Sequence, residues 1–168
     1  DDSESFWLVA RAQGWPVGLC EGSFYQTPDG VLQMMLRSNT ERLWHCCSTD
    51  DGASWSAPVP TAFSDNATKF HLGRLPDGRW YYIGCPDAEP RWTRSPLVLS
   101  LSADGIHFDQ HFLLADASTP YVRRRDGLHK GGDYGYPHSF IHAATLWVIV
   151  SRRKEAVEVL SVPLAALG

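Results

Sequence analysis

Five side chains able to transfer protons or carry charge stand at matching places in three similar stretches of this sequence. They are Glu21, Lys69, His71, Tyr136 and His138. Each stands near the start of an otherwise apolar segment, where packing does not require a polar group. A carboxylate, a phenol and two imidazoles near a cation suit acid–base or nucleophilic chemistry.

The three stretches repeat one pattern of short strands and turns. A Pro-Asp-Gly turn occurs at 28–30 and again at 76–78, between segments rich in Val, Leu, Trp and Tyr, and a third turn lies near 143–144. This pattern is typical of antiparallel strands. No stretch shows sustained helical periodicity, and only 164–167 is expected to form a short turn. The sequence therefore predicts three β-units at approximately 19–58, 66–115 and 134–164, with a long loop at 117–133.

Aligning the units by their turns places the candidate residues at two levels. One level holds Glu21, Lys69 and Tyr136, and the next holds Ser23, His71 and His138. The two levels point to the same side because side chains alternate along a strand. If the first strands of the units lie side by side, these groups converge on one site.

Residues 48–55 read Ser-Thr-Asp-Asp-Gly-Ala-Ser-Trp and fit the Asp-box pattern Ser-x-Asp-x-Gly-x-Ser/Thr-Trp. Residues 101–108 keep the Gly and the aromatic residue but have Ala103 where the first Asp should be. In such a motif Asp and Gly form a tight turn and Trp55 covers it, so its role is structural. The pattern resembles the sialidase-like β-propeller superfamily, whose Asp-boxes are also called BNR repeats.

The resemblance implies an all-β fold, a partial β-propeller of about three antiparallel blades from the C-terminal part of a five- to seven-bladed ring. The chain, 1–168, would be a single propeller segment. Residues 6–10 would form the closing strand of a preceding blade. An open arc leaves apolar blade faces in water, so the remaining blades or a second chain are expected partners.

The resemblance also implies roles for particular residues. In sialidases a Glu, an Arg of a carboxylate-binding triad and an Asp-box follow in the order of Glu21, Arg37 and residues 48–55 here. Arg91 or Arg94 would supply another triad Arg, and Tyr136 would be the nucleophile whose proton Glu21 removes. Guanidinium groups suit a sugar carboxylate because they form paired hydrogen bonds. The family's first triad Arg and its Asp general acid have no convincing match before Glu21.

Two other functions fit the same residues. His138, His71 and Lys69 suit proton abstraction beside a uronate carboxylate, as in propeller-type polysaccharide lyases and rhamnose-uronate-cleaving enzymes. Arg152 could add a carboxylate ligand under either scheme. A propeller that binds glycans without cleaving them is the third possibility. Both enzymatic schemes require an acidic oligosaccharide or polysaccharide.

Composition narrows the partners further. The 168 residues are 43% hydrophobic and carry a formal net charge of -4, which argues against a nucleic-acid partner. The apolar run 146–150 is only of strand length and no signal peptide is visible, so we expect no membrane segment, and secreted, periplasmic and cytoplasmic locations all remain open. No metal or other cofactor is expected, because the four cysteines lack metal-binding spacing and are expected to be free thiols: Cys20, Cys46, Cys47 and Cys85.

Overall fold

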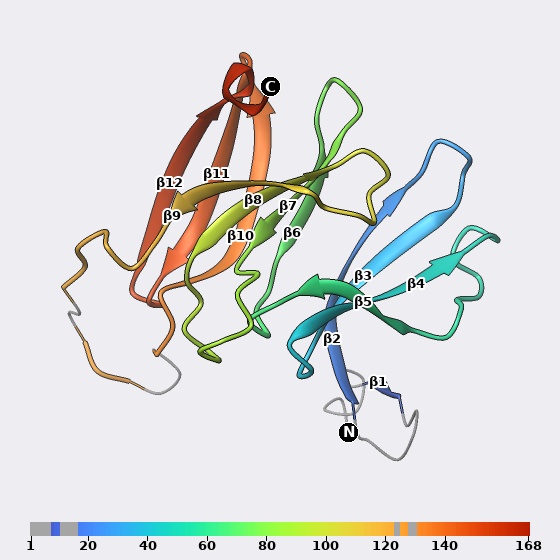
Figure 1. The fold of residues 1–168 in the computed structure, drawn as a ribbon, viewed down its shortest axis with the longest axis horizontal. Helices are drawn as coiled ribbons and strands as arrows, with labels where there is room; N and C mark the ends of the chain where they lie inside the picture. The colour runs from blue at the N-terminus through green and yellow to red at the C-terminus, as the bar shows by residue number, and fades with distance from the viewer. Residues whose placement is uncertain (1–7, 11–16, 123–124, 128–130) are drawn as a thin grey trace.

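The computed structural model describes residues 8–10, 17–122, 125–127 and 131–168, and in these residues the fold is all-β (Figure 1). The expected fold class is therefore confirmed. Three antiparallel sheets follow one another along the chain. The expected turn near the end is a 3₁₀ helix, Leu164–Leu167.

The strands fall into three consecutive groups. The first sheet has the order β1 (Leu8–Ala10), β2 (Val17–Gln26), β3 (Leu32–Ser38), β4 (Arg42–Ser48) and β5 (Val59–Ser64). The middle sheet contains β6 (His71–Arg74), β7 (Trp80–Gly84), β8 (Leu97–Ser102) and β9 (Gln110–Ala115). The last sheet contains β10 (Tyr134–His142), β11 (Thr145–Arg152) and β12 (Ala156–Pro163).

The sheets pack side by side through their first long strands. β6 contacts β2 on one side and β10 on the other, and Figure 1 shows these strands next to one another. Each later strand lies further out, as in the blades of a propeller. Residues at matching positions of β2, β6 and β10 are therefore brought together.

The sequence analysis did not predict two of the strands and assigned a third to the wrong blade. β5 and β9 each follow an Asp-box and pair with β4 and β8. Pro60 lies within β5, which is tolerated because β5 is an edge strand, but it hides the strand pattern. The expectation that 6–10 closes a preceding blade is wrong for Leu8–Ala10, which pairs with β2 inside the first sheet. Residues 6 and 7 lie outside the described residues.

The middle sheet is covered on both faces. Its side chains alternate between two apolar layers, so that Tyr82 packs towards the first sheet and Ile83 towards the last. Every residue of β7 and β8 is buried. This explains why these strands read as continuous apolar runs rather than alternating ones.

Both Asp-boxes are hydrogen-bonded turns at the edges of the sheets. In the first, Asp50 accepts hydrogen bonds from Ser48 Oγ (2.7 Å) and Ser54 N–H (2.9 Å). In the second, Asp104 accepts the equivalent bonds from Ser102 Oγ (2.9 Å) and the backbone N–H groups of residues 106 and 107. The second box is one residue shorter between its Ser and its Gly. Asp104 therefore makes the hydrogen bonds that the sequence pattern assigned to the position of Ala103.

The four cysteines are free thiols, and Cys46 is buried while its neighbour Cys47 is partly exposed. Adjacent residues of a strand point to opposite faces, which accounts for the difference. Among the described residues there is no helix long and apolar enough to cross a membrane.

Candidate functional site

The candidate residues gather at one end of the three sheets, which we call the rim. The strand pairs Cys20 with Arg37, His71 with Ile83, and Tyr134 with Arg152 all lie at this end. It is the lower end of β2, β6 and β10 in Figure 1. Both Asp-boxes follow strand ends at the opposite end, which agrees with their structural role.

Two rim residues have unusual backbone conformations. Glu21 has a φ of 47° and Tyr136 a φ of 54°, and each lies at a break in the pairing of its strand, β2 or β10. A positive φ costs a non-glycine residue roughly 1 to 3 kcal/mol and persists only where the surroundings enforce it. Bulges often redirect side chains next to active sites. Both distortions lie at the rim, at matching positions of the two strands.

Glu21 is bound to two cations. Arg37 Nη1 donates to the Glu21 carboxylate at 2.6 Å, and Lys69 Nζ donates to the Glu21 carbonyl at 3.1 Å. Burial opposes the charge of Arg37, but the hydrogen bond and charge of Glu21 raise its pKa above the ordinary value. Burial lowers the pKa of Lys69, and Glu21 opposes this shift. Glu21 and Lys69, which the sequence placed at one level, are therefore in contact through the Glu21 backbone carbonyl.

The sequence offered Arg91 or Arg94 as a further carboxylate-binding arginine, and the structure places Arg94 beside Tyr136. Its guanidinium carbon lies 5.9 Å from the centre of the Tyr136 ring. Arg91 instead pairs with Glu41 at 3.2 Å and donates to the carbonyl of Asn39 at 2.9 Å. Arg91 therefore ties the loop after β7 to the first sheet and is already engaged.

His71 and His138 lie against each other, with ring centres 4.5 Å apart. Burial, with the nearby His138 and Lys69, lowers the pKa of His71 to about 4. His71 is therefore neutral near pH 7, whereas His138 is solvent-exposed on β10. These two histidines, which the sequence placed at the second level, are therefore also in contact.

Arg152 lies away from these groups. It is only 1% exposed, its guanidinium carbon is 4.3 Å from the centre of the Tyr134 ring, and Nη2 donates to the carbonyl of Thr119 at 2.8 Å. Within the described part of the chain, its Nε and Nη1 have no hydrogen-bond partner. These contacts secure the segment before β10, so a direct part in carboxylate binding stays a prediction.

The sequence interpretation missed two buried polar residues behind the rim. Asp65 and Asn66 are 0% and 1% exposed and lie between β5 and β6. Burial raises the pKa of Asp65 to about 7, although hydrogen bonds from Thr68 and Tyr82 and the charge of Arg37 oppose this rise. Asp-Asn in a connecting segment looks like an ordinary turn, so nothing in the sequence distinguished it.

The rim thus offers three cations, a carboxylate, a phenol and two imidazoles. Tyr136 is 48% exposed, and the side chains of Glu21 and Arg37 are 27% and 15% exposed, so a ligand can reach them. Among the hydrogen bonds of the described residues, none joins Tyr136 to Glu21, whose partner is Arg37. Arranged in this way, the groups can bind an anion and present a phenol beside it.

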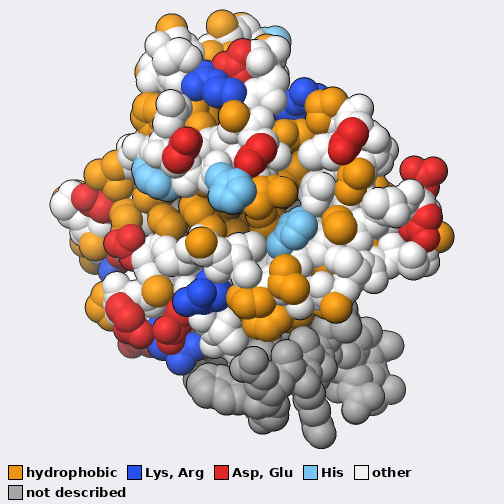
Figure 2. Space-filling model, turned by 45° about the vertical axis from the view of Figure 1, so that its right-hand side comes forward, with side chains coloured by type: hydrophobic (Ala, Val, Ile, Leu, Met, Phe, Trp, Pro, Cys, Tyr) orange, Lys and Arg blue, Asp and Glu red, His pale blue; other side chains and the backbone are white. Residues whose placement is uncertain are grey.

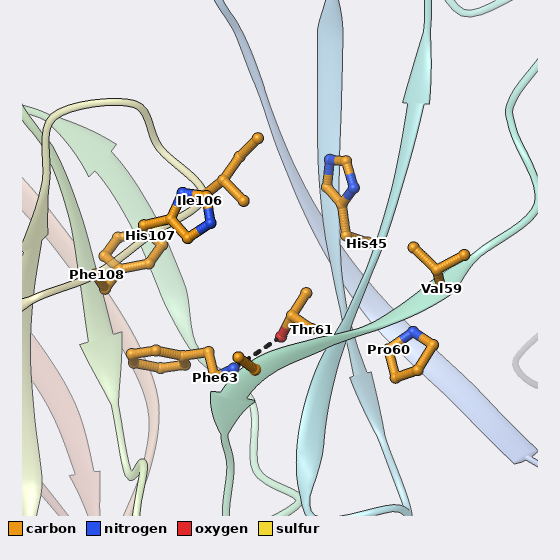
Figure 3. Close-up of a pocket in the computed structure, with 9 residues that line it drawn as sticks. His45, Val59, Pro60, Thr61, Phe63, Ile106, His107 and Phe108 are labelled. Atoms are coloured by element: carbon orange, nitrogen blue, oxygen red, sulfur yellow. Dashed lines mark hydrogen bonds between the residues drawn. The ribbon is translucent and has the colours of Figure 1, made fainter.

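A separate hollow of 340 Å³ lies between β5 and the second Asp-box (Figure 3). Phe63 and Phe108 line it, with His45 and His107 at its sides. Figure 2 shows one face of the molecule on which histidine side chains lie among apolar ones. None of the rim residues lines this hollow.

The chain belongs to the BNR repeat-like domain family, whose pattern matches residues 1–148. This finding agrees with the resemblance seen in the Asp-boxes. No curated protein matches the chain.

Solved structures show the same fold. A protein of unknown function from Dyadobacter fermentans is 19% identical, with a TM-score of 0.58 over 91% of this chain and 39% of that one. A GH43 β-1,3-galactosidase is 13% identical, with a TM-score of 0.55 over 81% of this chain and 27% of that one. This chain therefore spans well under half the length of either structure that it matches.

Proposed function

We propose that this chain is part of a carbohydrate-active enzyme that acts on acidic glycans at the rim. The observation that carries the proposal is that Arg37 and Lys69 bind Glu21 while Arg94 lies beside Tyr136, with Glu21 and Tyr136 both at strained breaks in strand pairing. Clustered cations favour an anionic ligand. The fold likeness to a galactosidase supports a sugar as the bearer of that charge.

In the sialidase-like scheme, Arg37 and Arg94 hold the sugar carboxylate and Tyr136 attacks the anomeric carbon. A neutral phenol suits this attack because a substrate with a carboxylate on that carbon repels an anionic nucleophile. Glu21, fixed by Arg37 at 2.6 Å, accepts the phenolic proton after a side-chain movement that brings the two groups into contact. The leaving group receives its proton from an acid outside this chain.

Further blades complete the ring in this proposal. The face of the last sheet that points away from the middle sheet carries Phe140, Ile149, Val157 and Val159, which are 62%, 46%, 67% and 61% exposed. Exposed apolar faces of this kind are suited to packing against another sheet. A neighbouring blade from the same protein or a second chain would cover this face and supply the missing acid.

The experiment is incubation of the protein with sialosides, read by release of free sialic acid. Tyr136→Phe should lower hydrolysis at least about a thousandfold, because the nucleophile is lost. Glu21→Gln should also be severely impaired. Leu113→Ala changes a residue that is 63% exposed on the outer strand β9, away from the rim, and should keep wild-type rates. Full activity in both Tyr136→Phe and Glu21→Gln would reject the sialidase-like scheme.

The contact of His71 with His138 favours one alternative, cleavage of a uronate-containing polysaccharide by proton abstraction. A pKa of about 4 makes His71 a weak base, so the exposed His138 would remove the proton. The unsaturated product absorbs ultraviolet light. His138→Ala should abolish this signal while His142→Ala, an exposed histidine of the same strand, should not.

Saturable binding of acidic glycans without release of any product would favour the third possibility, a non-catalytic glycan-binding propeller. The Tyr136→Phe and His138→Ala proteins would then bind as the wild type does if neither residue contacts the sugar. Absence of both binding and turnover, in a protein with all its blades, would contradict the acidic-glycan proposal altogether.

A further inference from the structure

Asn66 connects several pieces of the backbone that leads to Arg94. Its side-chain Nδ2 donates to the carbonyls of Asp87 (2.6 Å) and Pro90 (3.1 Å), and its Oδ1 accepts the backbone N–H of Arg94 (2.9 Å). Its own N–H donates to the carbonyl of Cys85 at 2.9 Å. The carboxamide of Asn66 thus holds residues 87, 90 and 94, and its backbone N–H holds residue 85, so that Asn66 fixes both ends of the segment 85–94.

Arg94 needs this support because its conformation is unfavourable. It has a φ of 53°, and its carbonyl accepts the N–H of Tyr134 at 3.0 Å, which links it to the start of β10. A Cβ on Gly132 would lie 2.4 Å from Arg94 Cδ, and one on Gly135 would lie 2.7 Å from Arg94 Nη1. The side chain thus passes closely over two glycines before it reaches the ring of Tyr136.

We propose that Asn66 is the positioning residue of the rim: its carboxamide holds Arg94 in the conformation that places the guanidinium beside Tyr136 for an acidic sugar. The identity of the ligand rests on the proposed function, whereas the positioning rests on the contacts alone. Asn66 does not touch the ligand and acts only through Arg94.

Only an amide side chain can make this set of bonds. Nδ2 supplies donors for the carbonyls while Oδ1 supplies an acceptor for the Arg94 N–H. An aspartate has nearly the same shape but would direct an oxygen at the carbonyls of Asp87 and Pro90. An alanine would remove the bonds to the Asp87 and Pro90 carbonyls and to the Arg94 N–H, all of which are partly buried. Asn66→Asp is therefore the most selective test.

The experiment compares Asn66→Asp with Asn39→Asp in the full chain. Asn39 is exposed at the turn between β3 and β4. Among the described residues its carboxamide makes one hydrogen bond, in which Oδ1 accepts the N–H of Gly18 at 3.0 Å, so an aspartate preserves this contact. The first measurement is hydrogen exchange of the Arg94 amide by NMR. Asn66→Asp should speed this exchange at least about tenfold, and Asn39→Asp should leave it unchanged.

The second measurement is the affinity for N-acetylneuraminic acid and D-glucuronic acid, with D-glucose as a neutral control. Asn66→Asp should weaken binding of one of the acids at least about tenfold. Arg94→Ala should weaken it too, and the double variant should be no weaker than Arg94→Ala alone, because the two changes act through one group. A general loss of stability would not produce this coupling.

Several results would decide the matter. Unchanged Arg94 exchange in Asn66→Asp, or losses of affinity that add fully in the double variant, would overturn the inference. If Asn66→Asp does not fold, hydrogen exchange of the Arg94 amide in the wild-type protein is the test. Exchange as fast as that of an exposed loop amide would contradict the positioning, and protection from exchange would support it. If the wild type binds neither acid but the exchange results hold, the proposed function fails while the positioning of Arg94 stands.

Discussion

The middle and last sheets are built from similar strands but differ in what covers them. All of β7 and β8 is buried, because the first sheet packs on one face and the last sheet on the other. In β11 buried residues alternate with more exposed ones, and the exposed face continues across the sheet in the paired row of His138, Ile149 and Val159. The middle sheet thus has an apolar interface on each of its two faces, whereas the last sheet has one on a single face.

The difference teaches that sheet neighbours, rather than strand sequence, decide which apolar residues stabilise this protein. Val159 and Leu99 are both aliphatic strand residues, yet one is 61% exposed and the other 0%. The rim follows the same rule. Arg94 is held by Asn66 from the connection between the first two sheets, and His71 lies against His138 of the last sheet, whereas Tyr136 is 48% exposed.

The largest effect should come from opening the middle sheet. Leu99→Ala leaves a cavity between the middle and last sheets and should lower the free energy of unfolding by about 2 to 5 kcal/mol. Val159→Ala, on the open face of the last sheet, should cost less than about 0.5 kcal/mol. Urea denaturation of both variants tests the comparison, and equal losses would show that the open face is covered in solution.

A second test uses the carboxyl group of Asp65, which is buried between the first and middle sheets. The pKa of Asp65 is raised from 3.8 to about 7, so its ionisation opposes folding. The contribution of Asp65 to stability should be fully present below about pH 4, decline as the pH rises to 7 and then level off, with a loss of roughly 4 kcal/mol at most. Asp65→Asn should remove this decline and be more stable than wild type at pH 8. Asp109→Asn, an exposed matched change, should keep the wild-type profile, as measured by denaturation at several pH values.

A smaller effect is expected from charging the open face. The double change Val157→Lys and Val159→Lys should alter the unfolding free energy by no more than about 0.5 kcal/mol, because both side chains are already in water. It should lower binding of a hydrophobic dye and disrupt any assembly that uses this face. Light scattering and dye fluorescence report these properties. An unchanged assembly would mean that this face is not an interface.

The smallest effect concerns the exposed first Asp-box, which is ordered by hydrogen bonds rather than burial. Bonds from Ser54 and Ser48 lower the pKa of Asp50 to about 2. The stability that Asp50 contributes is present above about pH 4 and is lost as the pH falls through 2. Asp50→Asn should therefore be less stable than wild type at pH 7 and approach it near pH 2. Thermal melts across this range, with Asp51→Asn as control, check the trend.

Much of the architecture could be predicted from local sequence. The Pro-Asp-Gly turns and the box at 48–55 have short-range physical causes, and aligning the units by their turns paired Glu21 with Lys69 and His71 with His138, which are in contact in the structure. The outer strands β5 and β9 were missed because an edge strand needs only one partner and tolerates residues such as Pro60. In the second box, a one-residue change in turn length hid the role of Asp104.

By itself the sequence determined the all-β class and the three consecutive groups of strands, since these follow from turn chemistry and a two-residue period. Only the tertiary structure decided that Arg94 rather than Arg91 faces Tyr136, and that Asp65 and Asn66 lie buried behind the rim. Those choices depend on positive-φ backbone and on contacts between separate sheets, where residues distant in sequence set each other's conformation.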